Sequence, residues 1–379
     1  MPAPPANPLD PDFLAQLTAA LAEHAERYDR SGEFPADCIA LLRERGLLAL
    51  TVPQAFGGGG ASLATARQVV SAVAQGEPST ALILLMQYIQ HARLHHSPRW
   101  PAHWKQRLAL DAVETGALLN ALRVEPDLGS PARGGLPATI ARRTPEGWRL
   151  SGRKIYSTGS HGLSWLQVWA RSDDPDPLVG NWLVRNGSPG IRIEPTWDHL
   201  GMRATCSHDM VFEDVLVPLD QAVSVSPASA PHAEFDNEDQ LWMAVLLSSL
   251  YDGIARAARD DFRRWLKARV PANLGAPLAT LPRFQERLGQ IESLLLANQA
   301  LLDSAAEGRV SPAQAPAIKY LATRTAIEAV SLAIEAGGNP ALDRRNALER
   351  HYRNVLCGRI HTPQDDSALI AMGKLSLAG

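Results

Sequence analysis

The sequence is poor in cysteine and contains no long apolar run. Its three cysteines, Cys38, Cys206 and Cys357, are single and far apart. An odd number of widely spaced cysteines implies neither a disulfide framework nor a Cys-pair zinc site, and it suits a reducing cytoplasm. The longest aliphatic stretch, Ala81 to Met86, is too short to span a bilayer. Because Met1 to Asp12 also lacks the basic cluster of a secretory signal, we expect a cytoplasmic protein without a membrane span.

Charge of one sign is scarce as well. The chain has 37 lysines and arginines against 40 aspartates and glutamates, a formal net charge of −3. This balance gives no electrostatic reason to expect a nucleic-acid partner. Hydrophobic residues make up 45% of the chain and charged residues 20%, which is typical of folded globular proteins. A length of 379 residues suffices for two or three domains.

The pattern of apolar residues divides the chain into three parts. Spacings of three and four predict helices in the first third and again in the last third, whereas the middle contains short β-rich runs separated by Gly, Pro and Asp. Several short strands at such spacing favour an antiparallel barrel or sandwich over a parallel α/β sheet. We therefore predict an N-terminal α-helical domain over residues 1–117, a middle antiparallel β-barrel over 118–223, and a C-terminal four-helix-type bundle over 232–379.

Several isolated features could indicate a catalytic or metal site, but the neighbouring residues that such a site requires are missing. The run Gly57 to Gly60 lacks the following Gly-Lys-Ser/Thr of a phosphate loop, so it predicts a tight turn. His91 and His95 lie one helical turn apart, but no carboxylate occurs between Pro78 and Leu110 to complete a metal site. The sequence also has no Gly-x-Ser-x-Gly nucleophile elbow. We predict no metal site.

Four stretches carry more information when they are taken together. They are Val52 to Gly58, Leu122 to Ser130, Ser151 to Gly159 and His199 to Pro218. The first is a glycine-rich turn, the second an apolar strand end that runs into an acidic turn, and the last two adjoin apolar strands. In this order, and on these expected elements, the sequence resembles the acyl-CoA dehydrogenase superfamily of flavoproteins along nearly the whole chain.

The resemblance implies a bound flavin, FAD or else FMN, whose ring lies between the sheet and the C-terminal bundle. Arg123, Val124, Gly129 and Ser130 match the family's stretch that bonds the pyrimidine edge and a phosphate of the flavin. Val124 replaces the family's threonine, so one hydroxyl contact is missing. Ser130 and the amides around Gly129 remain able to hold a phosphate oxygen.

Two further motifs match family positions that contact the flavin. Tyr156, Ser157 and Thr158 correspond to an aromatic residue that packs on the ring and a threonine that reaches its reactive nitrogen. Gly337 and Gly338 resemble the family's glycine turn, which contacts the adenosine end of a flavin held mainly by a neighbouring subunit. The resemblance therefore implies a homodimer or homotetramer.

The turn that should carry the catalytic base departs from the family pattern. Removing the α-proton of an acyl thioester requires a base, and the family uses a glutamate. By counting, Thr362 takes that position, with His361 beside it. Met243 takes the alternative position on the first bundle helix, although a shift of one turn would place Glu238 or Asp239 there instead. We predict His361 as the catalytic residue. Gln364 and Asp365, which follow it, are expected to border the cofactor.

The resemblance leaves three functions open. The first is oxidation of an acyl-CoA or related small substrate, with His361, Asp365 or Asp366 in place of the glutamate and an electron-transfer flavoprotein as a partner. The second is two-component monooxygenation, in which a separate flavin reductase supplies reduced flavin and no α-proton base is needed. The third is a non-catalytic binding scaffold. The Tyr156–Thr158 and Gly337–Gly338 motifs argue against the third.

Overall fold

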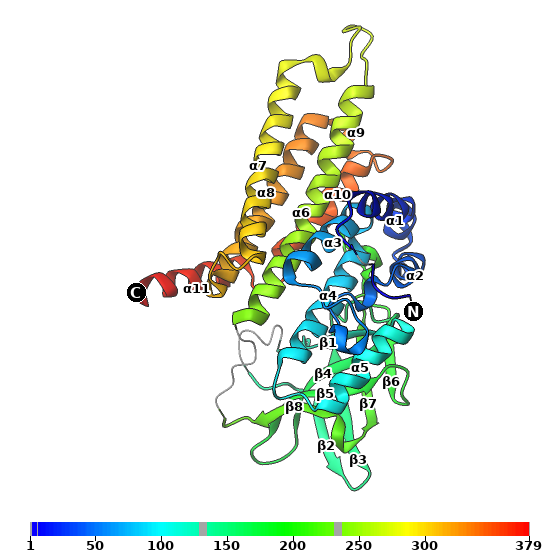
Figure 1. Cartoon of the computed structure of the whole chain (residues 1–379), viewed down its shortest axis with the longest axis vertical. Coiled ribbons are helices and arrows are strands. Elements are labelled where there is room, and N and C mark those ends of the chain that lie inside the picture. The colour runs from blue at the N-terminus through cyan, green and yellow to red at the C-terminus, as the bar shows by residue number, and fades with distance from the viewer. Residues whose placement is uncertain (1, 6, 129–134, 231–236, 379) are drawn as a thin grey trace.

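The computed structural model describes residues 2–5, 7–128, 135–230 and 237–378 (Figure 1). The sheet lies at one end of the molecule and the long C-terminal helices at the other, with the N-terminal helices against both (Figure 1). Within these ranges, no helix combines the length and the apolar character that crossing a membrane requires.

The N-terminal part is helical, as predicted, and α4 is its central element. Most residues of α4 are buried, because it contacts α3, α6 and the strand β1. Glu77 caps it by accepting hydrogen bonds from the amides of Ser79 and Thr80. The helices of this part are α1 (Pro11–Ser31), α2 (Ala36–Glu44), α3 (Leu63–Gly76), α4 (Pro78–His96) and α5 (Ala102–Thr115).

The middle part is one eight-stranded sheet in the order β6-β7-β3-β2-β4-β5-β8, with β1 paired to β4. It is neither fully antiparallel nor a barrel, so both features of the prediction are wrong. β1 and β2 each run parallel to β4. Within the described chain the two end strands, β6 and β8, do not pair with each other, so the sheet is open. The strands are β1 (Leu118–Leu122), β2 (Ile140–Thr144), β3 (Gly147–Lys154), β4 (Leu163–Ser172), β5 (Leu178–Arg185), β6 (Ile191–Glu194), β7 (Asp209–Val217) and β8 (Ala222–Pro227).

The length of β4 allows two strands to share one of its edges. β4 has ten residues, whereas β1 has five and covers only part of one edge of β4. β2 pairs with the end of that edge, where Ile140 faces Arg171, and β5 covers the other edge. Turn residues predict hairpins between successive strands, but they carry no information about which distant strands pair.

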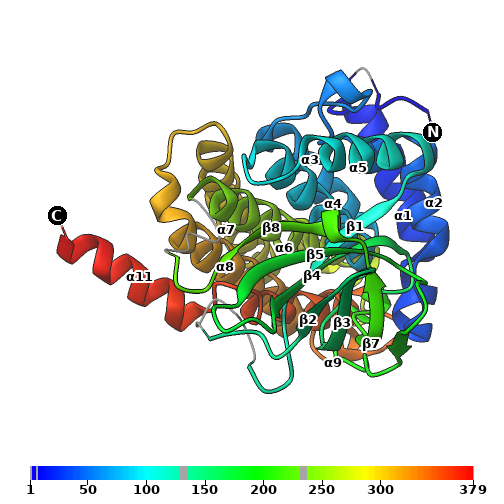
Figure 2. The same ribbon diagram turned by 90° about the horizontal axis from the view of Figure 1, so that it is seen from below.

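The C-terminal part is helical, as predicted. Its long helices α6, α7 and α8 pack along one another, and the shorter α10 lies against α6 and α8 (Figure 1). α11 contacts α8 and then projects away from the body in both views (Figures 1 and 2). These helices are α6 (Asn237–Ala268), α7 (Pro282–Ala306), α8 (Ala315–Gly337), α9 (Asn339–Leu342), α10 (Ala347–Leu356) and α11 (Asp365–Ala378).

All three parts meet at the segment 199–208, which precedes β7. Arg353 of α10 forms a salt bridge with Asp29 of α1 at 2.7 Å. The amide of Met202 donates to the side-chain oxygen of Asn354 at 2.7 Å. A Cβ on Gly201 would lie 2.4 Å from the carbonyl oxygen of Arg353, so only glycine permits this approach. The sheet and the end of α10 are therefore held in one arrangement.

Candidate active site

The turn after β3 presents an aromatic ring to solvent. Tyr156 adopts a φ of 56°, and its side chain is 54% exposed. Its ring packs nearly perpendicular to the rings of Trp197 and His199. Those two rings stack on each other, with centroids 3.7 Å apart. A non-glycine residue held at positive φ is strained, and such strain is concentrated at functional sites. Trp197, which precedes β7, is half-buried beside this turn.

The next two residues carry buried hydroxyl groups. The hydroxyls of Thr158 and Ser207 lie 3.0 Å apart, and the Ser207 hydroxyl lies 2.8 Å from that of Thr205. The side-chain amide of Asn120 donates to the carbonyl oxygen of Thr158 at 3.1 Å. Ser157 differs from these residues, since its buried Oγ has no hydrogen-bond partner in the described chain. A buried hydroxyl without a partner indicates that another group, such as a ligand, would supply one.

The segment after β1 runs beside this turn. Val124 and Ile155 form an isolated antiparallel bridge, with a 2.9 Å hydrogen bond from the amide of Ile155 to the carbonyl of Val124. The guanidinium of Arg123 lies over the ring of Trp169, 5.3 Å from its centroid. Burial and the nearby charge of Arg93 lower the pKa of Arg123 to about 9. Gly129 and Ser130, predicted for the same segment, lie outside the described residues.

A buried ion pair holds that segment in place. Lys154 Nζ, at the end of β3, lies 2.6 Å from Glu125 Oε1, and both side chains are almost fully buried. Glu125 also accepts hydrogen bonds from the amides of Ala138 and Thr139 and from the Thr139 hydroxyl. Burial opposes ionisation of Glu125, but the hydrogen bond and charge of Lys154 keep the pKa of its carboxyl below the usual value.

His361 lies in the turn between α10 and α11. Its Nδ1 is 2.6 Å from the hydroxyl oxygen of Tyr251, a fully buried residue of α6. Burial and the charge of Lys319 lower the pKa of His361 to about 4. The side chain of Lys319 is completely buried, and its Nζ lies 3.8 Å from Asp365. The sequence contains no motif that singles out Tyr251 or Lys319, because both are single residues inside long helices.

The remaining predicted residues lie at different distances from this turn. Thr362 is exposed and Gln364 is half-buried next to His361. Gly337 and Gly338 end α8, and a Cβ on Gly338 would meet nothing within 4 Å. Eighteen residues of α8 separate Lys319 from Gly337, or about 27 Å at the helical rise per residue. A single chain therefore does not bring the glycine turn to His361.

Tyr156–Thr158 and His361 are connected through the segment 199–208. No hydrogen bond between the described residues joins Thr158 to His361 directly. Thr205 and Ser207 belong to the hydroxyl cluster at Thr158, while Gly201 and Met202 contact the end of α10, just before the His361 turn. The segment 199–208 thus contacts both the Thr158 turn and the end of α10, which precedes the His361 turn.

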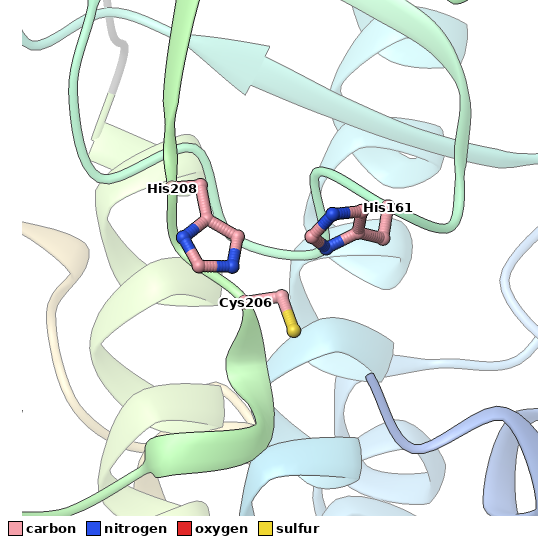
Figure 3. A group of neighbouring side chains, drawn as sticks. All are labelled: His161, Cys206 and His208. Atoms are coloured by element: carbon pink, nitrogen blue, oxygen red, sulfur yellow. The ribbon is translucent and has the colours of Figure 1, made fainter. Parts of the chain in front are cut away.

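Three potential metal ligands lie in or beside the segment 199–208. Donor atoms of His161, Cys206 and His208 all lie within 4.8 Å of one another (Figure 3). However, His208 Nδ1 accepts a hydrogen bond from the amide of Trp197 at 3.0 Å, so the neutral ring carries its proton on Nε2. Burial raises the pKa of the Cys206 thiol to about 11. Protonated donors oppose metal binding, and we assign no metal to this cluster.

A separate open cavity of about 760 Å³ lies between α1, α3, α6 and α10. The residues that line it include Arg256, Asp252, His351 and Asp261. These pair with one another, at 2.6 Å for Arg256 with Asp252 and 2.8 Å for His351 with Asp261. None of the predicted site residues lines this cavity, so it lies outside the candidate site.

Comparison with known proteins agrees with this arrangement. Three family profiles match in order: the acyl-CoA dehydrogenase N-terminal domain over residues 14–95, middle domain over 123–215 and C-terminal domain over 245–365. "Putative acyl-CoA dehydrogenase YdbM" of Bacillus subtilis (strain 168) is 32% identical over 363 residues, 94% of this chain and 93% of that protein. The chain belongs to the acyl-CoA dehydrogenase superfamily. The resemblance seen in its motifs is confirmed.

Solved structures divide between two branches of this superfamily of flavin-dependent oxidoreductases. A structure of KijD3 with FMN and dTDP-3-amino-2,3,6-trideoxy-4-keto-3-methyl-D-glucose has a TM-score of 0.78 and 26% identity, and covers 98% of this chain and 95% of that one. Butyryl-CoA dehydrogenase from Megasphaera elsdenii has a TM-score of 0.84 and 21% identity, with 97% of each chain covered. The latter likeness concerns the fold alone.

Proposed function

We propose that this chain is a flavin-dependent monooxygenase, which uses molecular oxygen and reduced flavin from a separate reductase to oxidise a small substrate. The observation that carries this proposal is that position 362 holds threonine and that Asp365, the first carboxylate after His361 in the sequence, is ion-paired. The family resemblance places Thr362 and Met243 at the positions of the base. Asp365 lies 3.8 Å from both Lys319 and Arg324, and therefore faces two cations. A dehydrogenase needs a base for the α-proton, whereas a monooxygenase does not.

The described residues fit a flavin at the Tyr156 turn. The exposed ring of Tyr156 offers a stacking surface, the Ser157 hydroxyl lacks a partner, and Val124 brings backbone groups alongside. A bound reduced flavin would supply two electrons to oxygen, with one oxygen atom entering the product and the other leaving as water. FMN and FAD both remain candidates, since KijD3 was solved with FMN.

The chain's own residues would bind the reactants, exclude water and transfer a proton. An aromatic cluster of Tyr156, Trp197 and His199 lies at the turn that also carries the hydroxyl groups of Ser157 and Thr158. His361 is neutral at neutral pH, because burial and Lys319 lower its pKa to about 4. Nδ1 of His361 is occupied by Tyr251, so Nε2 is the ring nitrogen left to contact a ligand.

Acyl-CoA oxidation is the second candidate, favoured by the 32% identity to YdbM. Two measurements on flavin-loaded protein separate the candidates. Anaerobic mixing with acyl-CoAs of several chain lengths should leave the flavin absorbance unchanged. NADH with a flavin reductase should support oxygen uptake that a substrate stimulates. Bleaching by an acyl-CoA would contradict the proposal, and protein that stays colourless with both FAD and FMN would favour the scaffold.

We also propose that the chain forms a homodimer or homotetramer. The Gly338 turn faces open space far from His361 along α8, and the projecting α11 exposes Leu369, Ile370, Leu375 and Leu377. Light scattering after size exclusion should give a mass of two or four chains. Leu369→Lys with Ile370→Lys should reduce this mass, because charge is unfavourable in an apolar interface. A monomeric wild-type protein would contradict the proposal.

A further inference from the structure

The hydroxyl of Tyr251 has a single partner. Tyr251 is fully buried in α6, and among the described residues its hydroxyl makes one hydrogen bond, to His361 Nδ1 at 2.6 Å. If Nδ1 carried the imidazole proton and donated it, the tyrosine proton would be left buried without an acceptor. Because buried donors are almost always paired, Tyr251 donates and Nδ1 accepts. A neutral ring then carries its one proton on Nε2.

The charged surroundings keep both groups in these protonation states. Lys319 on α8 is the charged group that acts on His361, and Cys357 acts on Tyr251. Lys319 in turn lies near Asp365 of α11, which also pairs with the exposed Arg324. Burial and Lys319 lower the pKa of His361 to about 4, and burial raises the pKa of Tyr251 well above its usual value. Protonation of Nδ1 would break the hydrogen bond from Tyr251, which opposes charging of the ring.

Lys319, whose charge helps to lower the pKa of His361, supports the neutral state of the ring. Its side chain is completely buried, and Nζ forms no hydrogen bond with any residue that the structure describes. Its nearest opposite charge is Asp365, at 3.8 Å. A second positive charge on His361 would therefore be placed next to an ammonium group that is only loosely compensated. The neutral form of the ring avoids this repulsion.

We infer that Tyr251 is a positioning residue that fixes His361 in the Nε2–H form, so that the ring presents a hydrogen-bond donor to the site. The inference rests on the proposed function and refines it. A ring that donates from Nε2 cannot also remove an α-proton with that nitrogen, but it can donate to a developing oxygen-centred charge. Tyr251 thereby favours oxygen chemistry over α-proton abstraction at this site.

The test is nitrogen NMR of the full chain labelled with ¹⁵N-histidine and without added flavin. The two ring nitrogens of a neutral histidine resonate differently when protonated and unprotonated, so the spectrum reads the tautomer directly. Loss of the His361 signals in His361→Gln assigns them. Between pH 6 and 8 the wild type should show a protonated Nε2 and an unprotonated Nδ1. Tyr251→Phe should reduce the preference for this tautomer about tenfold, the equivalent of one net hydrogen bond.

Tyr88→Phe is the matched control. Tyr88 is also fully buried, and its hydroxyl donates to the carbonyl oxygen of Leu47 at 2.9 Å, so this variant loses a similar hydrogen bond elsewhere. It should leave the His361 signals unchanged. A protonated Nδ1 in the wild type, or an unaltered tautomer in a folded Tyr251→Phe, would overturn the inference. If Tyr251→Phe does not fold, the wild-type spectrum alone decides.

The result of the NMR experiment can be told apart from the result of the oxygen-uptake experiment. The tautomer is measured without flavin, oxygen or substrate, so its failure leaves the oxygen-uptake experiment untouched. Conversely, flavin-loaded protein that consumes no oxygen would contradict the monooxygenase proposal even if the tautomer is as expected. In an active enzyme, Tyr251→Phe should also move the acidic limb of the pH profile upward from its wild-type position near pH 4, because the neutral ring loses its hydrogen bond.

Discussion

Replacing His361 by alanine is expected to lower turnover by about a hundredfold, the typical contribution of one positioned proton donor. The affinity for flavin should change much less, because the proposed flavin contacts come from Tyr156, Ser157 and Val124. The measurement is the rate of substrate-dependent oxygen consumption at saturating flavin, together with a fluorescence titration of flavin binding. Unchanged turnover would remove His361 from the mechanism.

The control for this variant is His103→Ala. His103 is exposed on α5 and pairs with Asp220 at 3.2 Å, away from the His361 turn. Its removal should leave turnover and flavin affinity unchanged. The pH profile adds a second check, since the pKa of His361 lies near 4. The wild-type rate should therefore stay level down to about pH 5 and fall only below it, because protonation of Nδ1 breaks the hydrogen bond from Tyr251 that positions the ring.

Replacing Lys154 by methionine is expected to lower the free energy of unfolding by about 3–5 kcal/mol, the cost of leaving one partner of a buried ion pair uncompensated. The carboxylate of Glu125 would stay buried with the amides of Ala138 and Thr139 and the Thr139 hydroxyl as its remaining partners. Urea denaturation at pH 7 measures the loss. Lys267→Met, at the exposed end of α6, is the matched control and should change stability little.

The pH dependence distinguishes this cause from a simple packing defect. In the wild type, the lowered pKa of Glu125 contributes stability that is present above the usual carboxyl range and is lost as the pH falls through it. In Lys154→Met the pKa of Glu125 should rise, so the variant should be least destabilised at acidic pH. The double variant Glu125→Gln with Lys154→Met should recover part of the loss. An equal loss at every pH, with no recovery, would point to packing instead.

Local sequence patterns predicted the helical parts and one side of the candidate site. Apolar residues spaced three and four apart predicted α1, because a helix that packs on a core needs one apolar face. The Tyr156–Thr158 motif predicted a flavin contact at its turn, because its residues are adjacent in the chain and can be recognised as a motif. The positive φ of Tyr156 and the unpaired hydroxyl of Ser157 are seen only in the structure, because neither can be recognised from the sequence.

The pairing of distant elements could not be predicted in this way. The expected barrel was wrong because the edge of β4 is shared by β1 and β2, which depends on strand lengths and on contacts between distant residues. Trp197 and His199 likewise contact Tyr156 although they lie far from it in the sequence. Such contacts are long-range, and no local period or motif encodes them.

Periodicity was sufficient to predict the helical parts. The resemblance of four short motifs to the acyl-CoA dehydrogenase superfamily indicated the family and the position that lacks its glutamate, because motifs are properties of short stretches of chain. Only the folded chain decided what His361 can do. Its hydrogen bond and its charge state come from Tyr251 on α6 and Lys319 on α8, which lie far from it in sequence. Burial removes water from the Tyr251 hydroxyl, so its hydrogen bond must be made to the side chain that the packing places beside it.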